Sequence, residues 1–223
     1  MTESHPHAED VVPLLRGLSH AWAFWLALIG AIALLVLAPD GRARFAAAVY
    51  GLGLCALFGG SALYHRWPGD PSWRPLLRRI DHSTIFVFIA ASYTPPALLI
   101  LDGWVQTVVL AGVWIGALAG VIFSVVWISA PRALVAGTYL GLGWIALIAL
   151  PQLVERLEPI PLSLIVIGGV LYSIGALVYA RRRPDPWPRT FGFHEVFHAF
   201  VIAAAAAHFI AMAGWVIPQG GGS

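Results

Sequence analysis

Long apolar stretches, separated by short polar connections, run along almost the whole chain. A helix that crosses a bilayer needs roughly 20 largely apolar residues, and the pattern offers seven stretches of about that length. They lie at about 21–38, 44–65, 82–101, 105–127, 133–153, 160–180 and 194–217. The connections between them are short and contain Pro, Gly and Arg. The pattern therefore predicts an all-α membrane protein, a seven-transmembrane-helix bundle.

The composition supports this class and excludes others. Hydrophobic residues make up 59% of the chain and charged residues 11%, whereas an average soluble domain carries about 25% charged residues. The amino-terminal segment is polar and of mixed charge, without the basic region and cleavage site expected of a signal peptide. The single cysteine, Cys55, lies inside the second stretch, which excludes a disulfide within the chain. The pI near 9.0 reflects arginines in the connections and predicts no nucleic-acid partner.

The arginines also predict the orientation, because short positively charged loops stay in the cytoplasm. With the amino terminus inside, ten of the thirteen basic residues lie on the cytoplasmic side and three lie outside. The cytoplasmic set is Arg16, Arg66, Arg74, Arg78, Arg79, Arg132, Arg181, Arg182, Arg183 and Arg189, and the outer set is Arg42, Arg44 and Arg156. Seven spans then place the carboxyl terminus outside. We expect a flexible cytoplasmic tail at 1–20, a membrane domain at 21–217 and a disordered tail at 218–223.

Four ionisable side chains fall at one depth in this topology. His65 ends the second stretch, Asp81 precedes the third, and His194 and His198 open the seventh, all at the cytoplasmic boundary. Ionisable groups in lipid are costly and tend to mark functional sites. Histidines four residues apart lie on one helix face, so a single metal ion can hold both. The pattern predicts a metal site formed by His65, His194 and His198, and three histidines with one open position are typical of catalytic zinc.

Two further residues are candidates for catalysis beside this metal. Asp81 would take a proton from the attacking water, and the alternative is a surface salt bridge with Arg78 or Arg79, worth little. Ser61 lies one helical turn before His65 and could bind the water or a substrate carbonyl. Its alternative is a hydrogen bond to its own helix backbone. For the histidine pair, the alternative is a bond to neighbouring carbonyls at the membrane interface.

The remaining histidines are not expected to be ligands. His208 lies 14 residues beyond the start of the pair, which places it roughly 20 Å further across the membrane. His82 points about 100° away from the neighbouring aspartate and could contact the site indirectly. His20 could close the site from the side or lie at the interface. His5 and His7 are expected to be solvated in the amino-terminal tail.

The spacing also matches a protease motif, which the topology argues against. His194-Glu195-x-x-His198 is the zincin pattern, in which the glutamate is the general base. Intramembrane metalloproteases pair this pattern with a later Leu-Asp-Gly, and the chain contains Leu101-Asp102-Gly103. Here the order is inverted, and Asp102 is expected on the outer side, a membrane thickness away. Glu195 is at a helix start, where the helix dipole favours an acidic side chain.

Motifs in three helices together resemble one known family. They are Ser61-x-x-x-His65, Arg79-Ile80-Asp81-His82-Ser83, Ser92-Tyr93-Thr94-Pro95 and His194-Glu195-x-x-His198. In this order they are similar to the hemolysin III family, the bacterial branch of the progestin and adipoQ receptor superfamily. That superfamily includes the adiponectin receptors and is related to alkaline ceramidases. The resemblance extends from Arg16 to about Trp215.

The resemblance implies a fold and a site. It implies a seven-helix bundle of the cell membrane with its amino terminus inside, and Zn²⁺ held near the cytoplasmic face by His65, His194 and His198. It also implies that Asp81 contacts the water on the metal and that Ser61 lies close by. The chain departs from the family at Arg16, where many relatives carry an asparagine.

Two functional hypotheses follow. The first is a zinc-dependent hydrolase that cleaves an amide or ester of a membrane lipid at the cytoplasmic leaflet, as a ceramidase does. The alternative is a non-enzymatic membrane protein with a structural zinc, acting as a sensor or receptor or as a lytic, membrane-perturbing protein. A transporter is disfavoured, because the sequence shows neither a broken span nor a charge at mid-membrane.

Overall fold

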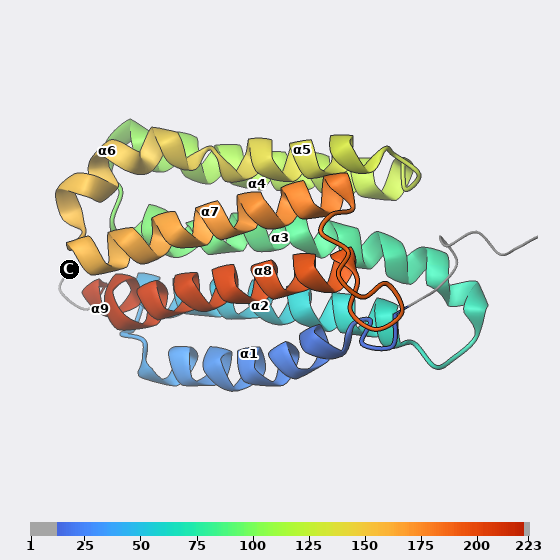
Figure 1. Cartoon of the computed structure of the whole chain (residues 1–223). Helices are drawn as coiled ribbons and strands as arrows, with labels where there is room; N and C mark the ends of the chain where they lie inside the picture. The colour runs from blue at the N-terminus through green and yellow to red at the C-terminus, as the bar shows by residue number, and fades with distance from the viewer. Residues whose placement is uncertain (1–12, 221–223) are drawn as a thin grey trace, which may run out of the picture.

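The computed structural model describes residues 13–220, which fold into one bundle of roughly parallel and antiparallel helices (Figure 1). The expected tails lie largely outside this range, as do His5 and His7. The long helices are α1 (Leu18–Leu37), α2 (Arg42–Arg66), α3 (Arg74–Leu99), α4 (Gly103–Val126), α5 (Arg132–Gly143), α6 (Ala146–Arg156), α7 (Pro159–Arg181) and α8 (Phe193–Ala211). The 3₁₀ turn η2 (Pro71–Trp73) precedes α3, and a π-helical turn, η3 (Met212–Val216), leads from α8 into α9 (Ile217–Gln219). The all-α class is confirmed.

Within residues 13–220, six helical segments are long and apolar enough to cross a membrane. They are Leu18–Leu37, Arg42–Arg66, Gly103–Val126, Arg132–Arg156, Pro159–Arg181 and Phe193–Gln219. The helix α3 is as long as these but is less apolar, because it carries Asp81 and His82 near its start and Pro95 and Pro96 near its end. It nevertheless packs between α2 and α4 within the same bundle.

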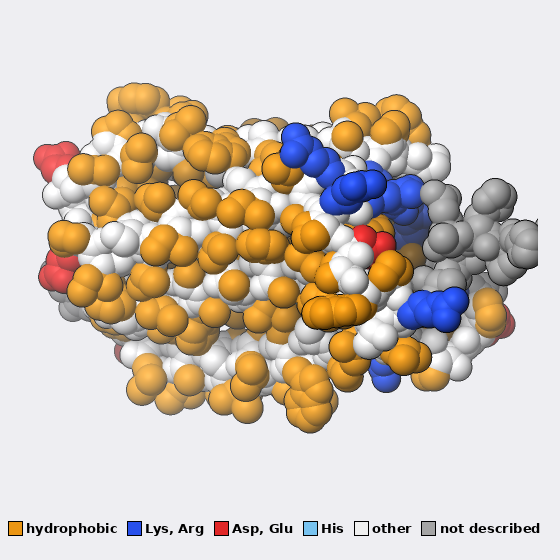
Figure 2. All heavy atoms as spheres, in the orientation of Figure 1, with side chains coloured by type: hydrophobic (Ala, Val, Ile, Leu, Met, Phe, Trp, Pro, Cys, Tyr) orange, Lys and Arg blue, Asp and Glu red, His pale blue; other side chains and the backbone are white. Residues whose placement is uncertain are grey.

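The surface of the bundle is suited to lipid along most of its length. Hydrophobic side chains cover the face seen in Figure 2, and arginine side chains gather at the end where α8 begins. Large apolar residues such as Leu26, Leu52 and Ile115 are exposed on these helices, as expected where hydrocarbon rather than water surrounds a protein.

The apolar stretch expected at 133–153 is not one continuous helix, contrary to the expectation from the sequence. Helix α5 ends at Gly143 and α6 starts at Ala146, and the hydroxyl of Tyr93 lies at the break. This hydroxyl donates a hydrogen bond to the Gly143 carbonyl and accepts one from the Ala146 amide at 2.9 Å. Glycine on the amino-terminal side weakens the helix, and Tyr93 replaces backbone partners that the break removes.

Close packing of α2 against its neighbours fixes the helix that carries His65. A Cβ on Gly53 would be 2.4 Å from the Ala91 Cβ of α3, and one on Gly51 would be 2.8 Å from the Ala31 Cβ of α1. These separations are too short for real side chains, so glycine is required for the approach. Helix α2 is therefore held tightly between α1 and α3.

We expect Gly53→Ala to lower the free energy of unfolding by about 1–3 kcal/mol, the usual cost of forcing an extra methyl group into a packed interior. Thermal unfolding of the purified protein in detergent would measure the change. Gly137→Ala in α5 is the matched control, because a Cβ there meets nothing within 4 Å. Equal melting temperatures for the two variants would contradict the packing account.

Candidate metal centre

The candidate ligands come from two helices whose ends meet. His65 lies in the last turn of α2, and His194 and His198 lie in the first two turns of α8. Helix α8 can begin at this point because Gly192 has an extended conformation and Glu195 caps the first turn through the Gly192 amide, at 2.8 Å. The start of α8 thereby presents two imidazoles, one turn apart, to the end of α2.

The three imidazoles form a compact group of nitrogen atoms. His65 Nε2 and His194 Nε2 are 3.0 Å apart, and one ligand atom from each of the three histidines lies within 4.8 Å of the others. A tetrahedral zinc ion with Zn–N distances of about 2.0–2.1 Å holds its nitrogens about 3.3 Å apart. The closest pair is thus already near ligand spacing, whereas the separations within the trio reach up to 4.8 Å, so the rings would have to draw together around an ion.

The donor set fits a metal ion in its chemistry as well. His198 is 2% exposed, and its Nδ1 atom is buried without a hydrogen-bond partner among residues 13–220. Buried polar atoms normally have a partner, and neutral imidazole is a good ligand for Zn²⁺ and other transition metals. The three histidines can therefore hold a metal.

Asp81 and Ser61 lie beside these histidines. The Asp81 carboxylate, 8% exposed, has its Oδ2 atom 3.9 Å from His65 Nε2. The Ser61 hydroxyl is 2.8 Å from His20 Nδ1 and also interacts with the Asp81 carboxyl group. Both candidates for catalysis are therefore within reach of a molecule bound at the histidines.

His20 forms one wall of the site. Its ring stacks on His198 with centroids 3.7 Å apart and planes 9° from parallel, and it is buried. The sequence allowed His20 to lie either beside the site or at the membrane interface, and in the structure it lies beside the site. Helix α1 approaches this closely because Gly17, with a φ of 73°, precedes it, and a Cβ there would be 2.4 Å from the His65 Cβ.

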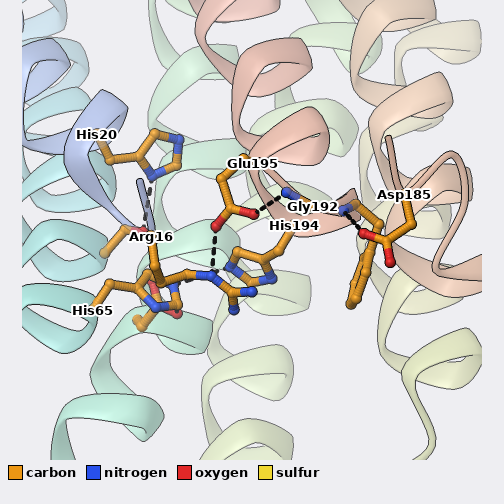
Figure 3. Close-up of polar contacts among 10 residues, drawn as sticks. Arg16, His20, His65, Asp185, Gly192, His194 and Glu195 are labelled. Carbon is orange, nitrogen blue, oxygen red and sulfur yellow. Dashed lines mark hydrogen bonds and ion pairs between the residues drawn. The ribbon is translucent and has the colours of Figure 1, made fainter. Parts of the chain in front are cut away.

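A partly buried ion pair lies beside the site, on the side of the amino terminus. Arg16 Nε donates to Glu195 Oε1 at 2.5 Å, and Glu195 is only 2% exposed (Figure 3). The other carboxylate oxygen of Glu195 accepts a hydrogen bond from the Gly192 amide, so both oxygens have a partner within the protein. The sequence predicts the position of Glu195 at a helix start, but it gives no sign that Arg16 is its partner.

A cavity of about 320 Å³ leads from the site into the bundle. His20, Ser61, Asp81, His194 and His198 line one end, and most of its remaining wall is apolar. Trp144, Leu147 and Val170 line the cavity and are 47–57% exposed. The cavity is partly open, and the α5–α6 junction, α6 and α7 contribute exposed apolar residues to its wall.

Comparison with known proteins decides the family. The sequence model of the family described as "Haemolysin-III related" matches residues 11–209. This chain belongs to that family. The "Hemolysin-3 homolog" of Bacillus subtilis (strain 168) is 33% identical over 161 residues, 72% of each chain. The "Hemolysin-3" of Bacillus cereus is 33% identical over 172 residues, 76% of this chain and 74% of the relative.

A more distant relative extends the similarity to animals. The "Monocyte to macrophage differentiation factor" of Homo sapiens is 27% identical over 204 residues, which cover 87% of this chain and 80% of the human protein. Membership of the haemolysin-III-related family, together with the six apolar helices of spanning length among the described residues, establishes an integral, multi-pass protein of the cell membrane.

The other polar residues named from the sequence lie outside the histidine trio of this haemolysin-III-related protein. His82 lines the cavity, and its carbonyl accepts a hydrogen bond from Tyr139. His208 also lines the cavity, but its Nε2 atom binds the Ile165 carbonyl at 3.0 Å. Asp102 pairs with Arg156 at 2.7 Å at the end of α3 that lies far from the start of α8 (Figure 1). The protease motif is therefore not assembled.

We expect Glu195→Gln to lower the free energy of unfolding by about 2–4 kcal/mol, because it leaves the partly buried Arg16 charge without its partner. Bound metal should be retained, since Glu195 contributes no atom to the trio. Asp102→Asn is the control: its ion pair with Arg156 is largely exposed and should be worth less than about 1 kcal/mol. Thermal unfolding and metal analysis of both variants test this, and loss of metal in Glu195→Gln would show that the role assigned to Glu195 is wrong.

Proposed function

We propose that this haemolysin-III-related protein is a zinc-dependent hydrolase that cleaves an amide or ester bond of a membrane lipid at the cytoplasmic leaflet. The observation that carries the proposal is the position of Asp81 and Ser61 beside three clustered histidines, at the polar end of a largely apolar cavity. Such a site can hold a carbonyl at one end and a hydrocarbon chain at the other.

The proposed metal is Zn²⁺, held by His65, His194 and His198. Three neutral histidines with an open fourth position are typical of catalytic zinc, which acts as a Lewis acid toward a carbonyl and acidifies water. The buried His198 Nδ1 and the 3.0 Å approach of the other two rings support this assignment.

Asp81 is proposed as the general base. It takes a proton from water as the water oxygen bonds to the carbonyl carbon of the substrate. The Ser61 hydroxyl donates a hydrogen bond to the oxyanion that forms. The C–N bond of an amide, or the C–O bond of an ester, then breaks, and Asp81 passes its proton to the leaving nitrogen or oxygen. His20 holds Ser61 in place through the 2.8 Å contact.

The proposed topology has seven spans, with α3 as the third and with the amino terminus in the cytoplasm. The distribution of arginines supports it, since ten of thirteen lie in the segments expected on the cytoplasmic side. Arginine side chains gather at one end of the bundle in Figure 2. The membrane domain would comprise 21–217, and the substrate would enter from the lipid. A lipid carbonyl near the headgroup boundary would then be at the depth of Asp81.

One observation favours the non-enzymatic alternative. The histidine trio joins the end of α2 to the start of α8, so a metal there would also link these helices and stabilise the fold. In that case the protein would be a sensor or receptor, or would perturb membranes, and would turn over no lipid.

Incubation of the zinc-loaded protein with a panel of ceramides, other lipid amides and lipid esters separates the two functions. The hydrolase account predicts release of free fatty acid from at least one of them, abolished by a chelator and restored by Zn²⁺. Full zinc occupancy without turnover across the panel would favour the structural alternative.

A further inference from the structure

A second polar cluster lies in the same cavity, away from the metal site. It consists of His208 in α8, Tyr172 in α7 and Tyr50 in α2, the first two of which line the cavity. His208 follows His198 by ten residues on α8, which separates the two clusters by roughly 15 Å along the bundle. The proposed chemistry uses none of these three residues.

His208 has a defined hydrogen-bonding state. Its Nε2 atom is 3.0 Å from the Ile165 carbonyl, and because a carbonyl only accepts, Nε2 carries the proton. The Nδ1 atom of the neutral ring is then an acceptor. The ring lies directly over Gly168 of α7, where a Cβ would be 2.2 Å from His208 Cδ2. A glycine at this position is what makes room for the histidine.

Tyr172 supplies a hydroxyl group that has no hydrogen-bond partner in the described part of the chain. Its ring packs edge-on against His208 with centroids 5.5 Å apart. The hydroxyl is buried without a hydrogen bond to any described residue, and the same is true of the Tyr50 hydroxyl. Leaving a buried hydroxyl without a hydrogen bond is costly, so such groups normally bind water or a ligand.

We propose that Tyr172 and His208 bind an oxygen on the hydrocarbon chain of the ligand, so that the protein prefers an oxygenated acyl chain, such as one with a hydroxyl at mid-chain. A hydroxyl both donates and accepts, which matches an imidazole acceptor beside a phenol donor. An unsubstituted chain would leave these groups unpaired in an apolar setting. The inference rests on the proposed function in that the occupant of the cavity is the substrate's acyl chain.

Binding rather than turnover tests the preference. Stearate and a mid-chain hydroxystearate would compete with a fluorescent fatty acid for the purified, zinc-loaded protein. We expect the hydroxylated chain to bind about tenfold more tightly, the effect of one to two good hydrogen bonds. Tyr172→Phe keeps the ring and removes the hydroxyl, so it should reduce the ratio to near one. Gly168→Ala should also reduce it by displacing His208.

Two controls make the result specific. Tyr139→Phe also removes a hydroxyl from the cavity wall, but that hydroxyl already donates to the His82 carbonyl at 3.2 Å, so the preference should remain. A stearate hydroxylated at its methyl end should bind no better than stearate. Thermal unfolding and metal content confirm that each variant is folded.

The outcomes distinguish this inference from the proposed hydrolase. Equal binding of the two fatty acids by the natural protein would overturn the inference, even if lipids are hydrolysed. A preference for the hydroxylated chain that persists in both Tyr172→Phe and Gly168→Ala would overturn it as well. Water would then be the hydrogen-bond partner of Tyr172 and His208. A preference that the two variants abolish would support it even if no lipid is hydrolysed.

Discussion

Replacing His194 with alanine should reduce bound zinc from about one ion per chain to almost none, because two histidines rarely hold zinc without a third ligand. Loss of the metal should also lower the free energy of unfolding. An ion whose free concentration is about 1,000 times its Kd stabilises the folded state by about 4 kcal/mol. Elemental analysis of the purified variant and thermal unfolding with and without Zn²⁺ measure both effects. The same results are expected for His65→Ala and His198→Ala.

His208→Ala is the matched control for the metal prediction. It removes a histidine from the cavity wall that is bound to Ile165 and lies outside the trio, so zinc should be retained in full. Natural protein that binds no metal after reconstitution, or a His194→Ala variant that keeps full occupancy, would show that the trio is not a metal site.

Replacing Asp81 with asparagine should lower kcat for lipid hydrolysis by at least about 100-fold, the usual contribution of a positioned general base. Asparagine keeps the size of the side chain but cannot take the proton. Zinc should remain bound, because Asp81 Oδ2 lies beside the histidines rather than among the three ligands. Released fatty acid and bound metal would be measured on the same preparation.

Asp102→Asn serves as the control for Asp81→Asn, since it removes a carboxylate at the opposite end of the bundle and should leave kcat unchanged. Undiminished turnover by Asp81→Asn would exclude this residue as the base. Loss of zinc together with turnover would instead assign Asp81 to the metal.

The sequence predicted those features that depend on helix length and spacing. Apolar stretches of spanning length indicated the helices, and the four-residue interval between His194 and His198 indicated a shared face. The short, arginine-containing connections allowed the end of α2 and the start of α8 to be placed at one depth. The depth of His65 in the membrane and the helix face shared by His194 and His198 were enough to predict that the three lie together. His65 and His194 are 129 residues apart in sequence.

Features that depend on the rotation and packing of helices could not be predicted in this way. The Arg16–Glu195 pair joins residues 179 apart, and the contact between His20 and Ser61 joins residues 41 apart. No local pattern specifies either. The break between α5 and α6 was also missed, because the partner that stabilises it, Tyr93, belongs to another helix. Glycines on α5 were the signal available, but glycine is common in membrane helices.

X-ray absorption spectroscopy of the purified, zinc-loaded protein tests the central claim most directly. We predict a single zinc environment of three imidazole nitrogens and one oxygen from exchangeable water, which becomes two nitrogens and additional oxygen in His194→Ala. A site closed by a fourth protein ligand would contradict the hydrolase account. Zinc spectra unchanged by His194→Ala would contradict the site itself.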